Sequence, residues 1–145
     1  MRVILTCGPS GSGKSTWIQN YLAQQDPHGV VVSADHHFMR NGVYEFRPDQ
    51  LKTAHSRCFR KFCEAMVNRV STICVDNTNT TKWEREPYIT HALANGYEVW
   101  LKVLDTPVAT CAARNKHGVG EETCTRQWNR MQSLQPGFYQ ITQVL

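Results

Sequence analysis

Eight consecutive residues, 8–15, contain three glycines and end in a lysine and a serine, and they directly follow the apolar run 3–7. They match the pattern G-x-x-x-x-G-K-[ST], and the apolar run predicts the buried strand that such a loop should follow. A loop of this type turns backbone N–H groups inward at the positive end of the next helix, where a polyphosphate can bind. A glycine-rich turn without a ligand is the alternative. The predicted nucleotide contacts are Gly8, Pro9, Ser10, Gly11, Ser12, Gly13, Lys14, Ser15 and Thr16.

The last two positions of the motif carry its charged and hydroxyl groups. Lys14 is expected to reach the β and γ phosphates as a compact point charge. The Ser15 hydroxyl is expected to complete the ligand shell of a Mg²⁺ ion. The motif therefore predicts that the chain binds ATP or GTP together with magnesium.

The length of the chain favours one domain. Its 145 residues can bury roughly two thirds of the surface that the unfolded chain exposes, so we predict a single domain over 1–145 without a second catalytic module. Hydrophobic residues make up 41% and charged residues 19%, and no long apolar span predicts a membrane segment. The first predicted strand starts within a few residues of Met1, which leaves no room for a signal peptide, so a cytoplasmic location is expected.

Neither the cysteines nor the charges point to a dedicated metal or nucleic-acid module. The six cysteines contain no C-x-x-C pair, so reduced packing thiols are expected rather than disulfides or zinc ligands. The net charge of +4 suits an anionic partner without requiring one. The basic residues of the central segment fit the solvated face of a helix; they are Arg57, Arg60, Lys61 and Arg69.

Short apolar runs alternate with amphipathic stripes along the whole chain. Such an alternation predicts βαβ units, and hence an α/β fold with a mostly parallel sheet and helices on both faces. The final segment, 136–145, fits either a further strand or a loose tail. Strands are predicted at 3–7, 30–33, 72–75 and 97–104, and helices at 15–25, 48–69 and 81–95, with two shorter helices on either side of 114–120.

Polar residues follow the predicted strands at the edge of the sheet where ligands bind in such folds. Asp35 comes after the second strand, where an acceptor hydroxyl can approach a γ-phosphate, and an aspartate carboxylate is ionised at neutral pH. We interpret Asp35 as the general base; a turn cap is the alternative. Asp76 ends the third strand and is predicted either as a magnesium ligand or as the start of an Asx turn.

The acceptor is expected to bind around the second and third strand ends. Amides at Asn77 and Asn79 either bind phosphate or acceptor, or close their own loop. Loop aromatics nearby either stack on a base or cover the edge of the core; they are Phe38, Tyr44, Phe46 and Trp83. The predicted acceptor contacts are His36, His37, Phe38, Arg40, Asn77 and Asn79.

Arg114 lies between the two shorter predicted helices, in a segment suited to a lid over 114–120. An arginine folded over the phosphates would offset the charge that spreads over their oxygens during transfer. An exposed arginine at a helix end is the alternative.

These residues, in this order, resemble the polynucleotide kinase branch of P-loop kinases. The resemblance runs from Arg2 to about Met131 and rests on the phosphate loop with Trp17, on Asp35, on the run 76–79 and on Arg114-Asn115. The stretches 76–88 and 114–119 also look like the P-loop domain of ubiquitin-ligase-binding proteins. A departure is Phe38, because the phage end-healing kinase has an arginine three residues after its catalytic aspartate, and Arg40 is the nearby substitute.

The resemblance implies a P-loop NTPase-type three-layer sandwich and an ATP- and Mg²⁺-dependent kinase. It assigns phosphate and magnesium binding to Lys14 and Ser15, proton abstraction to Asp35 and a lid role to Arg114. The expected acceptor is a hydroxyl on nucleic acid, most simply the 5′-hydroxyl end of DNA or RNA. Alternatives are a hydroxymethylpyrimidine base in DNA, a small-molecule alcohol, or a nucleotide-binding module without transferase activity. The oligomeric state is not predicted.

Overall fold

The computed structural model describes residues 1–115, 118–131 and 133–145. Its centre is a five-stranded sheet in the order β2-β5-β1-β6-β7, in which the first four strands are parallel and β7 is antiparallel to β6. The predicted α/β fold with a mostly parallel sheet is confirmed. The strands of the sheet are β1 (Arg2–Cys7), β2 (Val30–Val32), β5 (Thr72–Asp76), β6 (Glu98–Val103) and β7 (Gly137–Ile141).

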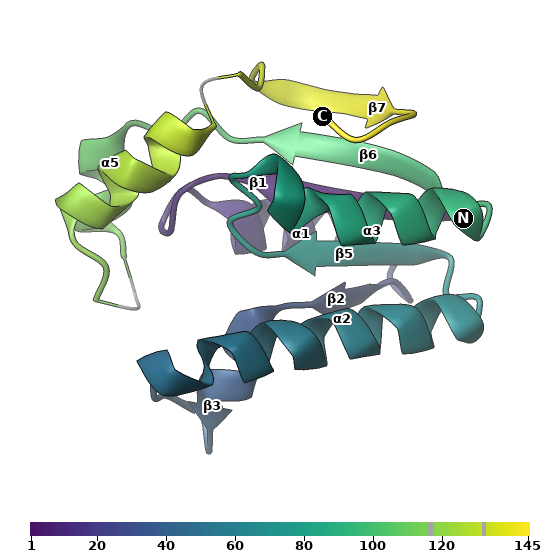
Figure 1. Ribbon diagram of the computed structural model, residues 1–145, viewed down its shortest axis with the longest axis horizontal. Helices are drawn as coiled ribbons and strands as arrows, with labels where there is room; N and C mark the ends of the chain where they lie inside the picture. The colour runs from purple at the N-terminus through teal and green to yellow at the C-terminus, as the bar shows by residue number, and fades with distance from the viewer. Residues whose placement is uncertain (116–117, 132) are drawn as a thin grey trace.

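Helices cover both faces of the sheet, as expected, and a further pair stands at one edge (Figure 1). In that view α2 and α3 lie in front of the sheet and α1 lies behind it. The pair α4 and α5 stands beyond the arrowheads of β5 and β6, at the carboxyl edge. The helices are α1 (Lys14–Gln25), α2 (Leu51–Val67), α3 (Lys82–Ala94), α4 (Val108–Ala113) and α5 (Glu121–Arg130), with 3₁₀ turns η1 (Ala34–Phe38) and η2 (Pro48–Gln50).

Two apolar clusters hold these layers together. On one face Ile18 and Leu22 of α1 pack against Ile4 and Cys74 of the sheet. On the other face α2 and α3 contribute residues such as Phe62 to the larger cluster. Full burial of one large apolar side chain stabilises the fold by about 1.5–3 kcal/mol. The sheet is therefore a rigid base for the loops at its carboxyl edge.

All six cysteines are free thiols, as predicted. Cys7 and Cys74 are fully buried in β1 and β5, and burial raises the pKa of each thiol to about 12. Thiols of this kind remain protonated and chemically inert at neutral pH. Within the described ranges, no group of three or more His, Cys, Asp or Glu side chains is placed to hold a metal ion.

The structure adds local detail to several elements. The segment 136–145 forms strand β7, which pairs with β6 and closes that side of the sheet. The loop at Asn41-Gly42 is a hairpin turn between β3 (Met39–Arg40) and β4 (Val43–Tyr44), because both turn residues adopt positive φ. At the start of α3, Thr81 accepts a hydrogen bond from the Glu84 N–H, but the Glu84 carboxylate returns to Thr80 rather than to Thr81.

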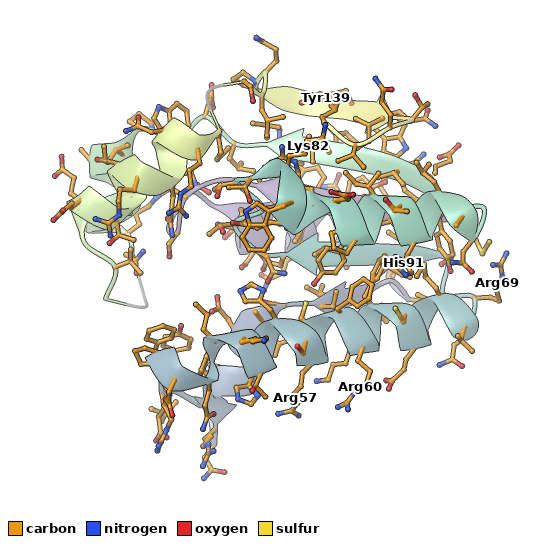
Figure 2. The ribbon with its side chains drawn as sticks, viewed as in Figure 1. Arg57, Arg60, Arg69, Lys82, His91 and Tyr139 are labelled. Atoms are coloured by element: carbon orange, nitrogen blue, oxygen red, sulfur yellow. The ribbon has the colours of Figure 1, made fainter. Side chains whose placement is uncertain are left out.

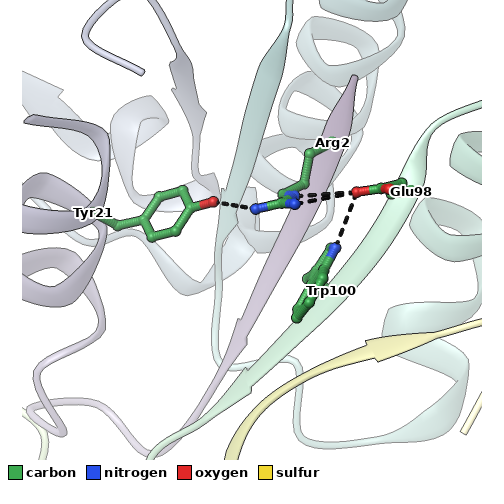
Figure 3. A network of polar contacts seen from close by, with 4 residues as sticks. All are labelled: Arg2, Tyr21, Glu98 and Trp100. Carbon is green, nitrogen blue, oxygen red and sulfur yellow. Dashed lines mark hydrogen bonds and ion pairs between the residues drawn. The ribbon is translucent and has the colours of Figure 1, made fainter. Parts of the chain in front are cut away.

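At the amino ends of the parallel strands, polar contacts around Arg2 connect neighbouring elements (Figure 3). Its guanidinium donates to the Tyr21 hydroxyl at 2.6 Å and to the Glu98 carboxylate at 3.2 Å. The Trp100 indole N–H donates to the same carboxylate at 3.4 Å. This network joins β1, α1 and β6 on the side away from the phosphate loop. No helix in the described ranges is long and apolar enough to cross a bilayer.

Candidate active site

The phosphate-binding loop connects β1 to α1 in a conformation that depends on glycine. Gly11 and Gly13 adopt φ values of 83° and 98°, in the left-handed region that side chains disfavour. Gly13 is the N-cap of α1, and in the described residues no side chain caps this helix. The first N–H groups of α1 are thereby left to an anion, at the positive end of the helix.

Lys14 lies across its own loop. Its ammonium group donates to the carbonyl oxygens of Gly8 and Pro9 at 3.0 and 2.9 Å. Burial lowers the pKa of Lys14, and the carboxylates of Asp76 and Asp35 partly offset this effect. The lysine charge is therefore held between the loop carbonyls and two acidic side chains, where a polyphosphate would be a stronger partner.

The end of β5 lies beside the loop because of the strand register. Thr6 of β1 pairs with Asp76, and two residues later the Gly8 N–H donates to the Thr78 carbonyl at 3.1 Å. The Ser15 hydroxyl donates to the Asp76 carboxylate at 2.6 Å. A hydroxyl and a carboxylate side by side are the oxygen ligands that Mg²⁺ prefers next to phosphates. The donor set fits magnesium.

Asp35 lies in the 3₁₀ turn η1, which follows the neighbouring strand β2. Ser33 caps the turn by accepting from the Asp35 N–H at 3.2 Å, and the Ala34 N–H donates to the Asn77 side chain at 2.9 Å. The Tyr44 hydroxyl donates to the Asp35 carboxylate at 3.2 Å. Burial, together with the nearby Asp35 charge, raises the pKa of Tyr44, so the phenol stays a proton donor. The carboxylate is therefore oriented from both η1 and β4.

These groups line one cavity of about 240 Å³ at the carboxyl edge of the sheet. It brings together the phosphate loop, the ends of β2 and β5, and the arginine that follows α4. The two acidic side chains and the two basic ones thus face a common space. The lining residues are Ser10, Gly11, Gly13, Lys14, Ser15, Thr16, Asp35, Asp76, Asn77, Thr78 and Arg114.

The α4 and α5 pair is bonded directly to the phosphate loop through Ser10. The Gln127 side chain accepts from the Ser10 N–H at 3.0 Å, and Asn115 donates to the Ser10 hydroxyl at 2.8 Å. Arg114 is exposed and reaches the cavity from the end of α4. Within the predicted lid, Lys116 and His117 lie outside the described residues.

Comparison with known proteins gives the family of this fold and site. The model of the AAA domain family matches residues 3–136, which is most of the chain. The chain belongs to the AAA domain family. Within this family it is a P-loop domain of the nucleotide-binding type, with the glycine loop and the paired Ser15 and Asp76 described above.

A curated relative of this AAA domain is NEDD4-binding protein 2 of Homo sapiens, which is 35% identical over 134 residues. The match covers 90% of the chain but only 8% of the human protein. The AAA domain therefore corresponds to a small part of that relative.

Solved structures share the fold at low sequence identity. A chain of the Pnkp1/Rnl/Hen1 RNA repair complex superposes with a TM-score of 0.72 at 17% identity, over 97% of this chain and 48% of that one. A second structure of the Pnkp1/Rnl/Hen1 complex gives a TM-score of 0.59 at 21% identity, over 78% and 38%. The predicted resemblance to P-loop kinases of the polynucleotide kinase type is confirmed as a likeness of fold. The chain spans about half or less of these structural relatives.

The structure corrects two predicted acceptor contacts of this AAA domain. Phe38 is 2% exposed, because its ring packs between those of His37, Tyr44 and Phe46 and into the larger core cluster. Asn79 is 1% exposed, and its amide donates to the carbonyl of Thr6 at 2.9 Å. Both side chains hold the loops in place and neither faces the cavity.

The other predicted acceptor residues are spread over a wider area. Asn77 lines the cavity while its side chain also fixes η1. His36 and Arg40 are exposed, and neither is among the residues that line the cavity. The His37 ring lies between Arg57, whose guanidinium donates to Nδ1 at 2.8 Å, and Gln50, 2.9 Å from Nε2. Since the guanidinium can only donate, Nδ1 is the acceptor and the Nε2 proton points to Gln50.

Sequence reasoning named Tyr44 only as a loop aromatic, and it missed Gln127 and Arg85. The contact of Tyr44 with Asp35 spans 9 positions and that of Gln127 with Ser10 spans 117, so no local pattern reveals them. Arg85 is 2% exposed and donates to the Asn79 carbonyl at 2.7 Å, so it buttresses the loop after β5. The role of Arg85 could have been predicted from the sequence. It lies in the apolar stripe of α3 with Tyr88, Ile89 and Ala92, where a buried charge is costly unless it is paired.

Proposed function

We propose that this AAA domain is an ATP-dependent kinase that transfers the γ-phosphate to a hydroxyl on nucleic acid, most simply a 5′-hydroxyl end. The observation that carries the proposal is that Asp35, Asp76, Lys14 and Arg114 line a single cavity with the phosphate loop. A nucleotide-binding switch needs the loop, magnesium ligands and lysine. It has no need of a second carboxylate facing them from the next strand.

Asp35 acts as the general base in this proposal. As the acceptor oxygen bonds to the γ-phosphorus, its proton passes to the Asp35 carboxylate, and the bond from phosphorus to the β–γ bridging oxygen breaks to release ADP. Tyr44 holds the carboxylate through its hydrogen bond at 3.2 Å. Orientation of the base by a group outside the reacting atoms reduces the entropy lost on reaching the transition state.

The remaining charged groups stabilise the phosphates. Lys14 is proposed to exchange its two carbonyl contacts for phosphate oxygens, and Arg114 to bind the same oxygens from the end of α4. Ser15 and Asp76 would hold Mg²⁺, which when bound neutralises charge on the phosphate oxygens. The segment 1–145 is proposed to work as one kinase domain.

Two findings support a nucleic-acid acceptor. The structural relative with the higher TM-score belongs to a complex described as an RNA repair complex. The chain also carries a net charge of +4, which favours a polyanionic partner over a neutral small alcohol.

The test is phosphate transfer from labelled ATP with Mg²⁺. The acceptors are a 5′-hydroxyl oligonucleotide, a duplex with an internal hydroxymethylpyrimidine, and free nucleosides. Label on the first acceptor supports the proposal, and label only on the second or third reassigns the acceptor. A protein that binds ATP and labels none of them is a non-catalytic module, and the kinase proposal fails.

Asp35→Asn tests the base and Glu86→Gln serves as its control, since Glu86 is an exposed carboxylate on α3, away from the cavity. Asp35→Asn should retain ATP affinity and lose transfer by about a hundredfold or more. Glu86→Gln should leave both ATP affinity and transfer unchanged. Near-normal turnover of Asp35→Asn would exclude it as the base.

A further inference from the structure

The positive charge of the chain is concentrated in one segment. Residues 40–61 contain six Lys and Arg residues against two acidic ones, a balance of +4. The rest of the sequence holds ten Lys and Arg against ten acidic residues. The whole formal net charge therefore comes from this segment, which we call the 40–61 surface.

The basic side chains of the 40–61 surface are all exposed. The segment runs from the β3–β4 hairpin through η2 and over the first eleven residues of α2. Figure 2 shows Arg57 and Arg60 on α2 pointing away from the sheet, on the same side of the helix. The exposed cations are Arg40, Arg47, Lys52, Arg57, Arg60 and Lys61.

This surface adjoins the cavity on the side of Asp35. Its β4 residue Tyr44 donates to the Asp35 carboxylate at 3.2 Å. Its α2 residue Arg57 donates at 2.8 Å to the ring of His37, two residues after Asp35 in η1. The charge therefore begins where an acceptor hydroxyl would be held and continues outward from there.

An aromatic ring is exposed in the middle of the same surface. Phe46 is 49% exposed, and its ring lies parallel to that of Tyr44 at a centroid distance of 6.4 Å and an angle of 10°. Phe38 packs edge-on against it at 5.1 Å. The Phe46 ring is thus held in place from within the fold, and exposed aromatic rings among cations are how proteins bind single-stranded nucleic acid.

We infer that the 40–61 surface binds the single-stranded part of a nucleic-acid acceptor, its phosphates on the cations and a base on Phe46. The inference rests on the proposed function, because it takes the reacting hydroxyl to lie at Asp35. An acidic peptide could pair with the cations, but its carboxylates would not stack on the aromatic ring of Phe46. A nucleic-acid strand uses both features.

The spacing of the cations suits a strand of a few nucleotides. Arg57 and Lys61 are four residues apart, about 6 Å along α2, and Arg60 lies between them. Phosphates in a stacked strand follow one another about every 3.4 Å. Three cations on this side of α2 therefore match two to three consecutive phosphates beyond the reacting end.

The test is equilibrium binding of a fluorescent 12-nucleotide single strand, measured by anisotropy over a range of salt concentrations. The variant Arg60→Gln/Lys61→Gln removes two exposed cations, of which Arg60 forms an exposed ion pair with Glu64 at 3.9 Å. Lys82→Gln/Arg130→Gln makes the same change of net charge on α3 and α5, outside the surface. Circular dichroism of both double variants checks the fold.

Each phosphate contact with a single strand contributes about 0.7 to the slope of log K against log salt. The Arg60→Gln/Lys61→Gln variant should lower that slope by about 1.4, while the control double variant keeps the wild-type slope. Phe46→Ala should weaken binding by about fivefold or more at fixed salt. Equal slopes in the two double variants, or equal affinity with Phe46→Ala, would overturn the inference, as would competition by poly-glutamate at the same charge concentration as the strand.

The same variants separate this inference from the kinase proposal. If the wild-type protein binds the strand with the expected salt dependence but transfers no phosphate, the kinase proposal is refuted and the strand-binding role of the 40–61 surface stands. If both double variants phosphorylate a 12-nucleotide acceptor with the same KM, the strand-binding role of the 40–61 surface is refuted and the kinase proposal stands.

Discussion

The tip of the phosphate loop packs against α4 with no room for a side chain. A methyl group on Gly11 would lie 2.2 Å from the Cys111 carbonyl oxygen, and Gly11 has a φ of 83°. Gly96, after α3, has a similar φ of 78°, and a methyl group there would meet nothing within 4 Å. Gly11→Ala and Gly96→Ala therefore share backbone strain and differ in the clash.

The two costs can be worked out separately. A left-handed conformation costs an alanine about 1–2 kcal/mol, in both variants. Relief of the Gly11 clash needs a shift of roughly 1 Å between the loop and α4. That shift strains the Ser10 hydrogen bonds to Gln127 and Asn115, each of which is worth about 0.5–1.5 kcal/mol. The expected losses are about 1–2 kcal/mol for Gly96→Ala and about 2–5 kcal/mol for Gly11→Ala.

The assay is thermal unfolding with and without ATP and Mg²⁺. At about 2.1 cal/mol/K per residue, 1 kcal/mol lowers the Tm of this chain by about 3 °C. Gly96→Ala should lose about 3–6 °C and Gly11→Ala about 6–15 °C. Nucleotide at a hundred times its Kd adds about 2.7 kcal/mol, or about 8 °C, to the wild type and to Gly96→Ala. Gly11→Ala should lose most of that gain; equal Tm values for the two variants, or full ATP stabilisation of Gly11→Ala, would refute the packing argument.

Three further changes test single contacts. Thr81→Ala removes the cap on the Glu84 N–H and should lower the free energy of unfolding by about 1 kcal/mol in urea; no change would show that the cap is idle. Tyr44→Phe removes the hydroxyl on Asp35 and should slow single-turnover transfer about tenfold with ATP affinity unchanged, whereas a parallel loss of ATP affinity would place Tyr44 in donor binding. Burial lowers the pKa of Lys14 in the folded chain below the value of 10.5 that it has in the unfolded chain. The unfolded chain therefore binds the proton more tightly, and the free energy of unfolding falls as the pH drops from 10.5 through the folded pKa. The unfolding free energy of the wild type minus that of Lys14→Met should therefore rise from pH 7 to pH 10.5, and a flat difference would count against this reasoning.

The donor half of the site follows from local sequence. The loop of residues 8–15, the strand before it and the helix after it are neighbours in the chain, and their chemistry is set by glycine, lysine and serine within a few positions. The position of Asp76 also follows, because parallel strands end at one edge and the sequence marks where each strand ends. This is why the fold and the phosphate loop could be predicted without coordinates.

The acceptor half depends on contacts between distant residues. Phe38 and Asn79 have the residue types of a binding loop, but both are buried, and their burial depends on the hairpin and on Thr6. The pairing of Arg57 with His37 spans 20 positions, and that of Gln127 with Ser10 spans 117. No periodicity in a single sequence reports such pairs. Phe38, Asn79 and His37 were therefore predicted without their structural roles, and Gln127 was not predicted.

For the proposed kinase, this division has a consequence for which acceptor is selected. The phosphate loop is bonded to α4 and α5, whereas Asp35 is held by β4 and, through His37, touches α2. The donor and acceptor halves thus have separate supports on either side of the cavity. Changes in residues 40–61 can therefore alter the acceptor without moving the Lys14 and Ser15 positions. An exchange of 40–61 between two such domains should carry acceptor preference with it and leave the KM for ATP within about threefold, and a change in ATP affinity of tenfold or more would show that the two halves are coupled.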